Sequence, residues 1–362
     1  MSLEDYQAPT PHIESVHEYW IEAYVADDIP RPGEALGIVS PDGDRVYAEV
    51  RALTGARRVQ AILPSMPSWL EPGLPVERTR KPVAFDTPTT GDLELRPTLL
   101  QPDGERGVTL HSERPSMMEL DGERPFVATG IEGIDLFSPV AGHGLNLVID
   151  VNREVDTFGL LAERVAGSVS AAVTIVVGTD LPSPDGNARR VVYEGTGPIH
   201  LMALRLGMRW AAHLRDQGQT VFVVAELPRP APSGESRPPA SASPSFGDVI
   251  DLMGSSLVST RTGRITTLLR LPMEAHQEGL AHIIETMDLG AVDSQIFLSE
   301  DGRYEPSRSF SRADVDSERQ AEAMGLLSRA HRVKEKIALF GEFDLEEGDL
   351  EVLERMRELG DL

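Results

Sequence analysis

Short runs of aromatic and β-branched residues, separated by turn residues, mark the first part of the chain. Such runs occupy residues 19–25, 45–50 and 58–63, and the sequence Pro-Asp-Gly-Asp at 41–44 provides a turn between the first two. Several short strands at this spacing are typical of a small barrel or sandwich. The pattern therefore predicts a β-barrel domain over residues 16–86, which follows a flexible tail over residues 1–15.

From residue 126 onward, continuous apolar segments alternate with longer segments of helical character. The predicted strands are residues 145–151, 171–177, 220–225, 264–271 and 295–298, and the predicted helices are residues 158–166 and 199–217. Fully apolar strands connected by helices imply a parallel sheet with both faces covered. We expect an α/β domain over residues 87–312 and a short helical C-terminal domain over residues 313–362.

A proline-rich stretch interrupts the α/β pattern at residues 227–246. It holds six prolines among Ser, Gly and Ala, with almost no large apolar side chains. A segment of this composition cannot bury a core, so we predict that it forms a disordered loop within the α/β domain.

The chain is strongly acidic and contains no cysteine. Its 34 Lys and Arg residues against 58 Asp and Glu residues give a formal net charge of -24, which disfavours nucleic acid or an anionic membrane as a direct partner. The lack of cysteine excludes disulfides and cysteine-ligated zinc, and the histidines show no metal-site spacing. The longest apolar run, residues 169–177, is too short to insert into a membrane. We expect a cytoplasmic protein that reaches a membrane only peripherally, through a larger complex.

The first strand of the α/β domain leads into a segment where a phosphate-binding loop, G-x-x-x-x-G-K-[ST], would belong. Asp150 and Val155 stand at its two glycine positions, Asp156 stands at its lysine position, and only Thr157 fits. A carboxylate about 4 Å from a phosphate charge costs roughly 4 kcal/mol at an effective dielectric constant near 20. We therefore expect this loop to be degenerate. The same residues also fit an ordinary turn whose acidic side chains stabilise the following helix.

Short motifs, in order along the chain, resemble those of the alpha and beta subunits of the ATP synthase head. They are residues 129–139 (TGIEGIDLFSP), 215–224 (RDQGQTVFVV), 259–267 (STRTGRITT), 293–298 (DSQIFL) and 307–312 (SRSFSR). The resemblance covers residues 19–362 and extends more distantly to the type III export ATPases. It implies an N-terminal β-barrel, a central RecA-like domain with a degenerate P-loop, and a helical C-terminal domain.

Two further positions depart from this family. Its glutamate that positions the attacking water falls at Thr179, and its magnesium-site aspartate falls at Ala225. Phosphoryl transfer depends on positioning and charge neutralisation, so the resemblance implies a subunit that cannot hydrolyse ATP by itself. We expect no cofactor or metal in this chain, and Mg-ATP or Mg-ADP in a catalytic beta-like partner of a hetero-hexamer.

Arg312 ends the motif whose final arginine, in the alpha subunit, reaches into the neighbouring subunit's ATP site. The resemblance implies that Arg312 acts there as an arginine finger supplied in trans, a contribution worth ~10³ to 10⁵ in rate. Arg308 is the competing candidate, and an ordinary surface arginine is the alternative reading.

The acidic segment at residues 342–350 is similar to a beta-subunit stretch that faces the central shaft. Its candidate shaft-facing residues are Asp344, Glu346, Glu347 and Asp349. A plain acidic turn between two helices explains the same residues, because the whole protein is acidic.

Three functions follow from these observations. The first is a non-catalytic, alpha-like subunit that alternates with an active partner in a hexameric ring, with a central shaft as a further partner. The second is an assembly or regulatory scaffold that derives from an ATPase and makes no catalytic contribution. The third is an ATPase that binds nucleotide through unusual contacts.

Overall fold

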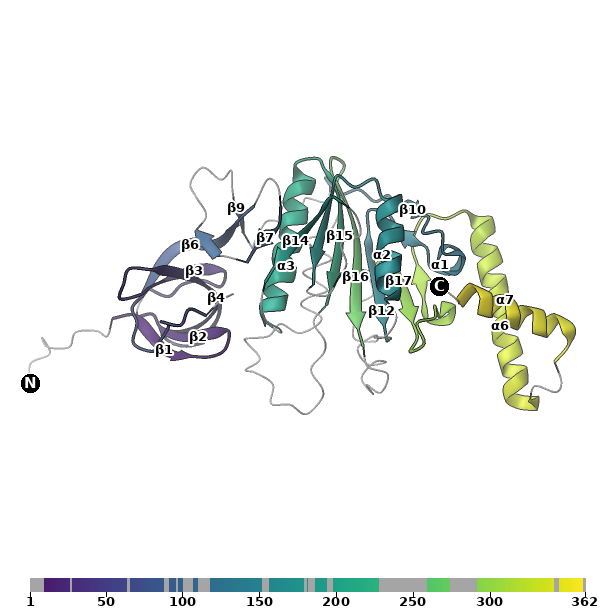
Figure 1. Ribbon diagram of the computed structural model, residues 1–362, viewed down its shortest axis with the longest axis horizontal. Helices are drawn as coiled ribbons and strands as arrows, with labels where there is room; N and C mark the ends of the chain where they lie inside the picture. Colours follow the sequence, from purple (N-terminus) through teal and green to yellow (C-terminus); the bar gives the residue numbers. More distant parts are fainter. Residues whose placement is uncertain are drawn as a thin grey trace, which may run out of the picture. The chain divides into compact units, whose positions relative to one another are not determined.

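The computed structural model divides the chain into two compact units (Figure 1). The first contains residues 1–114, 190–213 and 231–249, and the second contains residues 115–189, 214–230 and 250–362. The structure describes residues 10–26, 28–63, 66–87, 91–95, 97–99, 107–109, 118–151, 156–178, 181, 186–193, 198–227, 259–273, 292–341 and 345–360. Val155, Thr179, Asp344 and the predicted loop beyond Leu227 lie outside the described residues.

The first unit is built on a sheet of antiparallel strands. In spatial order these are β1 (His12–Val16), β2 (Trp20–Tyr24), β5 (Arg58–Ile62), β4 (Arg45–Gly55), β3 (Glu34–Val39), β6 (Val76–Asp86) and β8 (Pro97–Leu99), with β9 (Gly107–Thr109) also paired to β6. β1 also bonds the segment that leads into β6, because the Ile13 N–H donates to the Leu74 carbonyl at 2.9 Å. The hydrogen-bonded path from β1 to β6 therefore returns to its start.

Part of β1 lies within the residues expected to form a flexible tail. Ile13 is completely buried in a cluster with Ile21, Leu36 and Val59. The burial of Ile13, the packing of Val16 on the same cluster and the pairing of β1 to β2 account for the order of this segment from His12 onward.

A helix and a short strand pair add to the first unit. α3 (Pro198–Asp216) begins in it, and Nη1 of Arg205 lies 3.3 Å from each carboxylate oxygen of the buried Glu49 on β4. β7 (Leu93–Glu94) pairs in parallel with β14 (Ala188–Val192). These contacts join residues that are about a hundred or more positions apart in the sequence.

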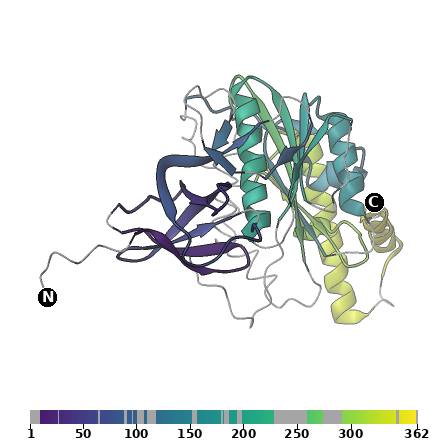
Figure 2. The ribbon, with the colours of Figure 1, turned by 60° about the vertical axis from the view of Figure 1, so that its left-hand side comes forward.

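Parallel strands form the centre of the second unit (Figures 1 and 2). Their spatial order is β17 (Ser294–Leu298), β12 (Leu145–Asp150), β16 (Arg264–Pro272), β15 (Thr220–Glu226) and β13 (Val173–Val177), and β18 (Phe310–Ser311) pairs antiparallel with β17. α2 (Thr157–Ser168) packs on one face, where Phe158 and Leu161 share a buried cluster with Val148, Phe222 and Leu268. Each strand and helix predicted for this sheet and for α3 is confirmed to within two residues. The assignment to a RecA-like domain stays a prediction.

The strand order reverses at β12. The chain leaves β12 through α2 to reach β13 at the far side, then returns through β15 and β16 before it passes to β17 on the other side of β12. In α/β sheets, ligands bind outside the carboxyl ends of the strands at such a reversal. Asp150 and Pro272 end the two strands at this point.

Helices close the C-terminal end of the second unit. α6 (Ser317–Phe340) and α7 (Glu347–Gly360) share an apolar cluster with Leu136 and Phe137 of α1 (Glu132–Phe137), and β10 (Phe126–Val127) pairs with β11 (Val140–Ala141) beside α1. In the described ranges, every helix is too short or too polar to cross a membrane.

Replacing Gly133 with alanine should loosen α7 from α1. A Cβ at this position would collide with the backbone carbonyl of Leu359, so one backbone segment has to shift. We expect Gly133→Ala to lower the free energy of unfolding by about 1–3 kcal/mol, the usual cost of overpacking, in urea denaturation. Gly325→Ala on α6, where nothing lies within 4 Å, is the control and should stabilise by about 1 kcal/mol. Equal unfolding midpoints for the two variants would contradict this packing.

Candidate functional site

Three charged side chains meet at the carboxyl ends of β12, β16 and β15. Arg270 on β16 donates from Nε to Oδ2 of Asp150 at 2.8 Å and from Nη1 to Oε2 of Glu226 at 3.2 Å. β16 lies between the other two strands, and Asp150 and Glu226 are their last residues. We call these three residues the carboxyl-edge network. It occupies the place where the strand order reverses.

The carboxyl-edge network is largely withdrawn from solvent. The side chain of Asp150 is completely buried, and those of Arg270 and Glu226 are 16% and 19% exposed. The guanidinium carbon of Arg270 lies 5.7 Å from the centroid of the Phe158 ring on α2. Burying charges is costly unless they are paired, so Arg270 is needed to hold both carboxylates in this position.

Asp156 caps the N-terminus of α2 from within the chain. Its Oδ1 accepts a hydrogen bond from the backbone N–H of Gly159 at 2.9 Å. The free N–H groups and the dipole of a helix N-terminus attract an anion, and here the carboxylate of Asp156 supplies it. Gly159 makes the close approach of this carboxylate possible, because a Cβ at this position would collide with it.

Thr157 also directs its hydroxyl into the protein. The residue is buried, and its Oγ1 lies 3.5 Å from the carbonyl oxygen of Gly302. Asp150, Asp156 and Thr157 were predicted as the remains of a phosphate-binding loop. The structure gives each of them an internal partner.

The TGIEGID sequence has a structural role in the turn before α1. Oδ1 of the buried Asp135 accepts from both the backbone N–H and the hydroxyl of Thr129, at 2.9 and 2.8 Å, and Oδ2 accepts from the Gly130 N–H at 3.0 Å. Gly130 has a φ of +73°, which a residue without a Cβ adopts without strain. This sequence therefore specifies a turn.

Arg312 lies near the other end of the sheet from the carboxyl-edge network. Its backbone N–H donates to the Asp293 carbonyl at 2.7 Å, just before β17 begins, whereas Asp150 pairs with Leu298 at the end of β17. Five strand residues correspond to about 16 Å. The Arg312 side chain is exposed, with its guanidinium carbon 5.9 Å from the Phe310 ring centroid. Arg312 cannot reach the network of its own chain.

Arg308 contacts two side chains of its own chain. Its guanidinium carbon lies 3.5 Å from the centroid of the Phe297 ring, and its Nη1 lies 3.7 Å from Oε2 of Glu305. The serines of the same motif fix the segment, since Ser309 Oγ accepts the Phe297 N–H at 3.0 Å and Ser311 Oγ donates to the Pro139 carbonyl at 2.6 Å. The motif is therefore anchored, and its last arginine stands at the surface.

The acidic segment that leads into the first turn of α7 contains one residue with an internal partner and two exposed residues. Asp349 lies 2.7 Å from Nζ of Lys336, and this hydrogen bond holds the pKa of Asp349 below its usual value. Glu346 and Glu347 are exposed. Asp349 therefore links α7 to α6 through Lys336. Of the three described candidates for a shaft-facing surface, Glu346 and Glu347 are the exposed ones.

Sequence reasoning missed Arg270 and Glu226. Ala225, assigned to a lost carboxylate position, is completely buried, and β15 continues for one residue to Glu226. The signal that could have found them is Arg270 itself, a charged residue within the apolar segment of β16. An arginine is rarely buried unless it pairs with an acidic side chain. Among the described residues, no three His, Asp or Glu side chains are arranged to hold a metal ion.

No profile of a known protein family matches this chain. The resemblance to rotary-ATPase head subunits therefore rests on the short motifs alone, and the family assignment stays a prediction.

Removing Arg270 should destabilise the second unit. Arg270→Gln leaves the carboxylates of Asp150 and Glu226 without their shared partner, and we expect a loss of about 3–5 kcal/mol in the free energy of unfolding, measured by urea denaturation. Adding Asp150→Asn should recover part of that loss, since one of the two carboxylates that Arg270 neutralises is then removed. Arg264→Gln, at the exposed start of the same strand, is the control and should change stability by less than about 0.5 kcal/mol. Equal effects of the two arginine variants would refute the pairing.

Proposed function

We propose that this chain is a non-catalytic subunit, similar to the alpha subunit of a rotary-ATPase head, that assembles with a catalytic partner into a hexameric ring. The observation that carries the proposal is the carboxyl-edge network. It lies at the carboxyl ends of the strands where the strand order reverses, which is where a sheet of this kind binds a ligand, and it pairs charged side chains of the chain with one another there.

Nucleotide binding at this crevice would have to overcome two internal interactions. A phosphate group at the N-terminus of α2 would displace the carboxylate of Asp156 from the Gly159 N–H. If Arg270 turned to the phosphate, Asp150 and Glu226 would lose their ion pairs with it, at a cost of about 3–5 kcal/mol. Micromolar binding corresponds to about 8 kcal/mol in total, so this single cost removes roughly half of it.

The proposed contribution to catalysis comes from Arg312. It is exposed, it follows a segment that Ser309 and Ser311 anchor, and it lies too far from Asp150 to serve its own chain. An exposed arginine on a fixed segment is suited to reach the ATP held by a neighbouring subunit, where a guanidinium stabilises the charge that develops on the transferred phosphoryl group. Any contact with a central shaft would involve Glu346 and Glu347, which are exposed.

Arg312→Ala should slow ATP hydrolysis by the reconstituted complex at least about 10³-fold, as expected when an arginine finger is lost. The proposal requires that a second ATPase-like chain with an intact phosphate loop co-purifies, and steady-state hydrolysis by that complex is the measurement. Arg308→Ala is the matched control, because Arg308 is occupied by Phe297 and Glu305, and it should leave the rate within a few-fold. An unchanged rate in Arg312→Ala, with a complex that still assembles, would favour the assembly scaffold instead.

The isolated chain should show no heat of binding with Mg-ATP in titration calorimetry at ligand concentrations up to about 100 μM. The reason is that a phosphate would have to displace the Asp156 carboxylate from the Gly159 N–H and compete with the internal ion pairs of the carboxyl-edge network. A micromolar dissociation constant would overturn the proposal that the site is closed and would favour an ATPase with unusual contacts. Titration of the co-purified catalytic partner provides the positive control.

A further inference from the structure

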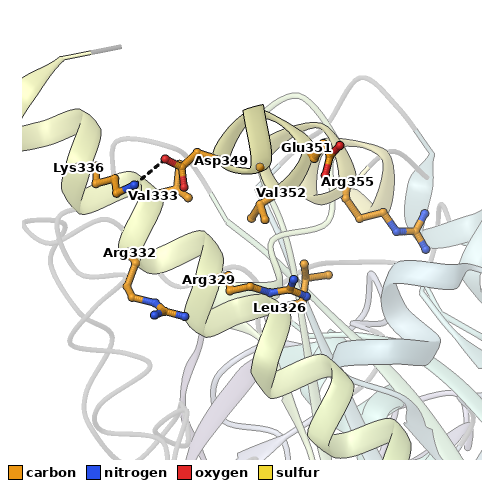
Figure 3. A pocket seen from close by; sticks show the side chains of 10 residues that line it. Leu326, Arg329, Arg332, Val333, Lys336, Asp349, Glu351, Val352 and Arg355 are labelled. Carbon is orange, nitrogen blue, oxygen red and sulfur yellow. Dashed lines mark hydrogen bonds and ion pairs between the residues drawn. The ribbon is translucent and has the colours of Figure 1, made fainter. Parts of the chain in front are cut away.

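A groove of about 490 Å³ runs between α6 and α7 (Figure 3). Its polar lining comes mainly from four cationic side chains, Arg329, Arg332, Lys336 and Arg355, together with the carboxylates of Asp349 and Glu351. The lining is therefore net positive, although the whole protein carries a formal charge of -24. The excess of cations among the lining side chains favours an anionic partner at the part of the groove that Arg329 and Arg332 line.

Two of the four cations have their charge satisfied within the protein. Lys336 pairs with Asp349 at 2.7 Å, and Arg355 pairs with Glu132 and, at 3.3 Å, with Glu358. Arg329 and Arg332 differ, since both are exposed and neither forms an ion pair within the part of the chain that the structure describes. Arg332 donates from Nε to the backbone carbonyl of Ser328 at 3.3 Å, which leaves its Nη groups for another acceptor. Figure 3 shows both side chains extended along α6.

The floor of the groove is apolar. Leu326 and Val333 of α6 meet Val352 of α7 beneath the charged side chains. Leu339, farther along α6, is 75% exposed. Leu326, Val333 and Val352 are only 7%, 3% and 9% exposed, so the apolar contact open to an occupant comes mainly from Leu339 beside the groove. An occupant that covers Leu339 and the two arginines needs apolar and acidic side chains together.

We infer that the α6–α7 groove is a docking site for an acidic, amphipathic helix of a partner protein. Arg329, Arg332 and Lys336 stand at positions i, i+3 and i+7 of α6, a span of about 10 Å along the helix axis. Glutamates at the same spacing on a second helix fall on one face and lie opposite these cations, while apolar residues beside them enter the groove. Guanidinium groups bind carboxylates with two parallel hydrogen bonds.

A nucleic acid fits this groove less well than a protein helix. Double-stranded DNA carries one charge per about 1.7 Å of axis, whereas an acidic helix presents about one carboxylate per 5.4 Å turn. The dense phosphate charge would be repelled by Asp349, Glu351 and the acidic remainder of the protein. A protein helix can place a neutral or basic residue opposite Glu351. The inference stands independently of the proposed ATPase role, because it uses none of the residues of the carboxyl-edge network and does not involve Arg312.

The test is the binding of a labelled helical peptide of about 20 residues, long enough to be helical alone, with leucines on one face and glutamates beside them. Fluorescence anisotropy with the full-length protein measures its affinity. We expect the double variant Arg329→Gln/Arg332→Gln to weaken binding at least about 10-fold and to reduce its dependence on salt. Lys334→Gln/Arg357→Gln, on exposed positions of the same helices outside the groove, removes the same charge and should leave binding unchanged.

Four results would overturn the inference. They are no binding of the peptide to the wild-type protein, equal losses in the two double variants, equal binding of a peptide with glutamine in place of glutamate, or tighter binding of an RNA oligonucleotide or an anionic vesicle through the same arginines. Equal urea midpoints for both double variants and the wild type would show that differences in affinity do not arise from unfolding.

Discussion

One arginine holds the carboxyl edge of the parallel sheet together. β16 is the middle of three strands, so Arg270 can reach the carboxylates that end both of its neighbours. Without a cation between them, Asp150 and Glu226 would repel each other at low dielectric constant. The position of this arginine thus fixes the charged side chains at the ends of β12 and β15, next to Phe158 of α2. Because Arg270 pairs with both carboxylates, the charges of Asp150 and Glu226 are neutralised by a side chain of the same sheet.

The strands of the second unit could be predicted because their segments are almost continuously apolar. Val173–Val177 is apolar except for Thr174 and is buried at every position, as expected of a strand that is covered on both faces. Elements that depend on pairing instead of composition were missed. β18 is two residues long and exists because it meets β17, while β1 depends on one buried isoleucine and on bonds to residues sixty positions later.

The candidate site was half predictable for a similar reason. Asp150, Asp156 and Thr157 lie at a strand-to-helix junction, where the local sequence shows that glycine and lysine are absent. Arg270 lies 120 residues from Asp150, and only the register between β12 and β16 brings them together. The sequence shows that β16 contains a charged residue, Arg270, among apolar ones, but it does not show which carboxylates pair with that residue.

The cap on α2 has a consequence for how this chain responds to its surroundings. A helix N-terminus that binds a phosphate group from solution is occupied to an extent that depends on the concentration of that ligand. Asp156 is joined to the helix it caps, so its carboxylate is present at a constant and very high effective concentration. An external anion at the N-terminus of α2 would therefore have to compete with a carboxylate of the same chain.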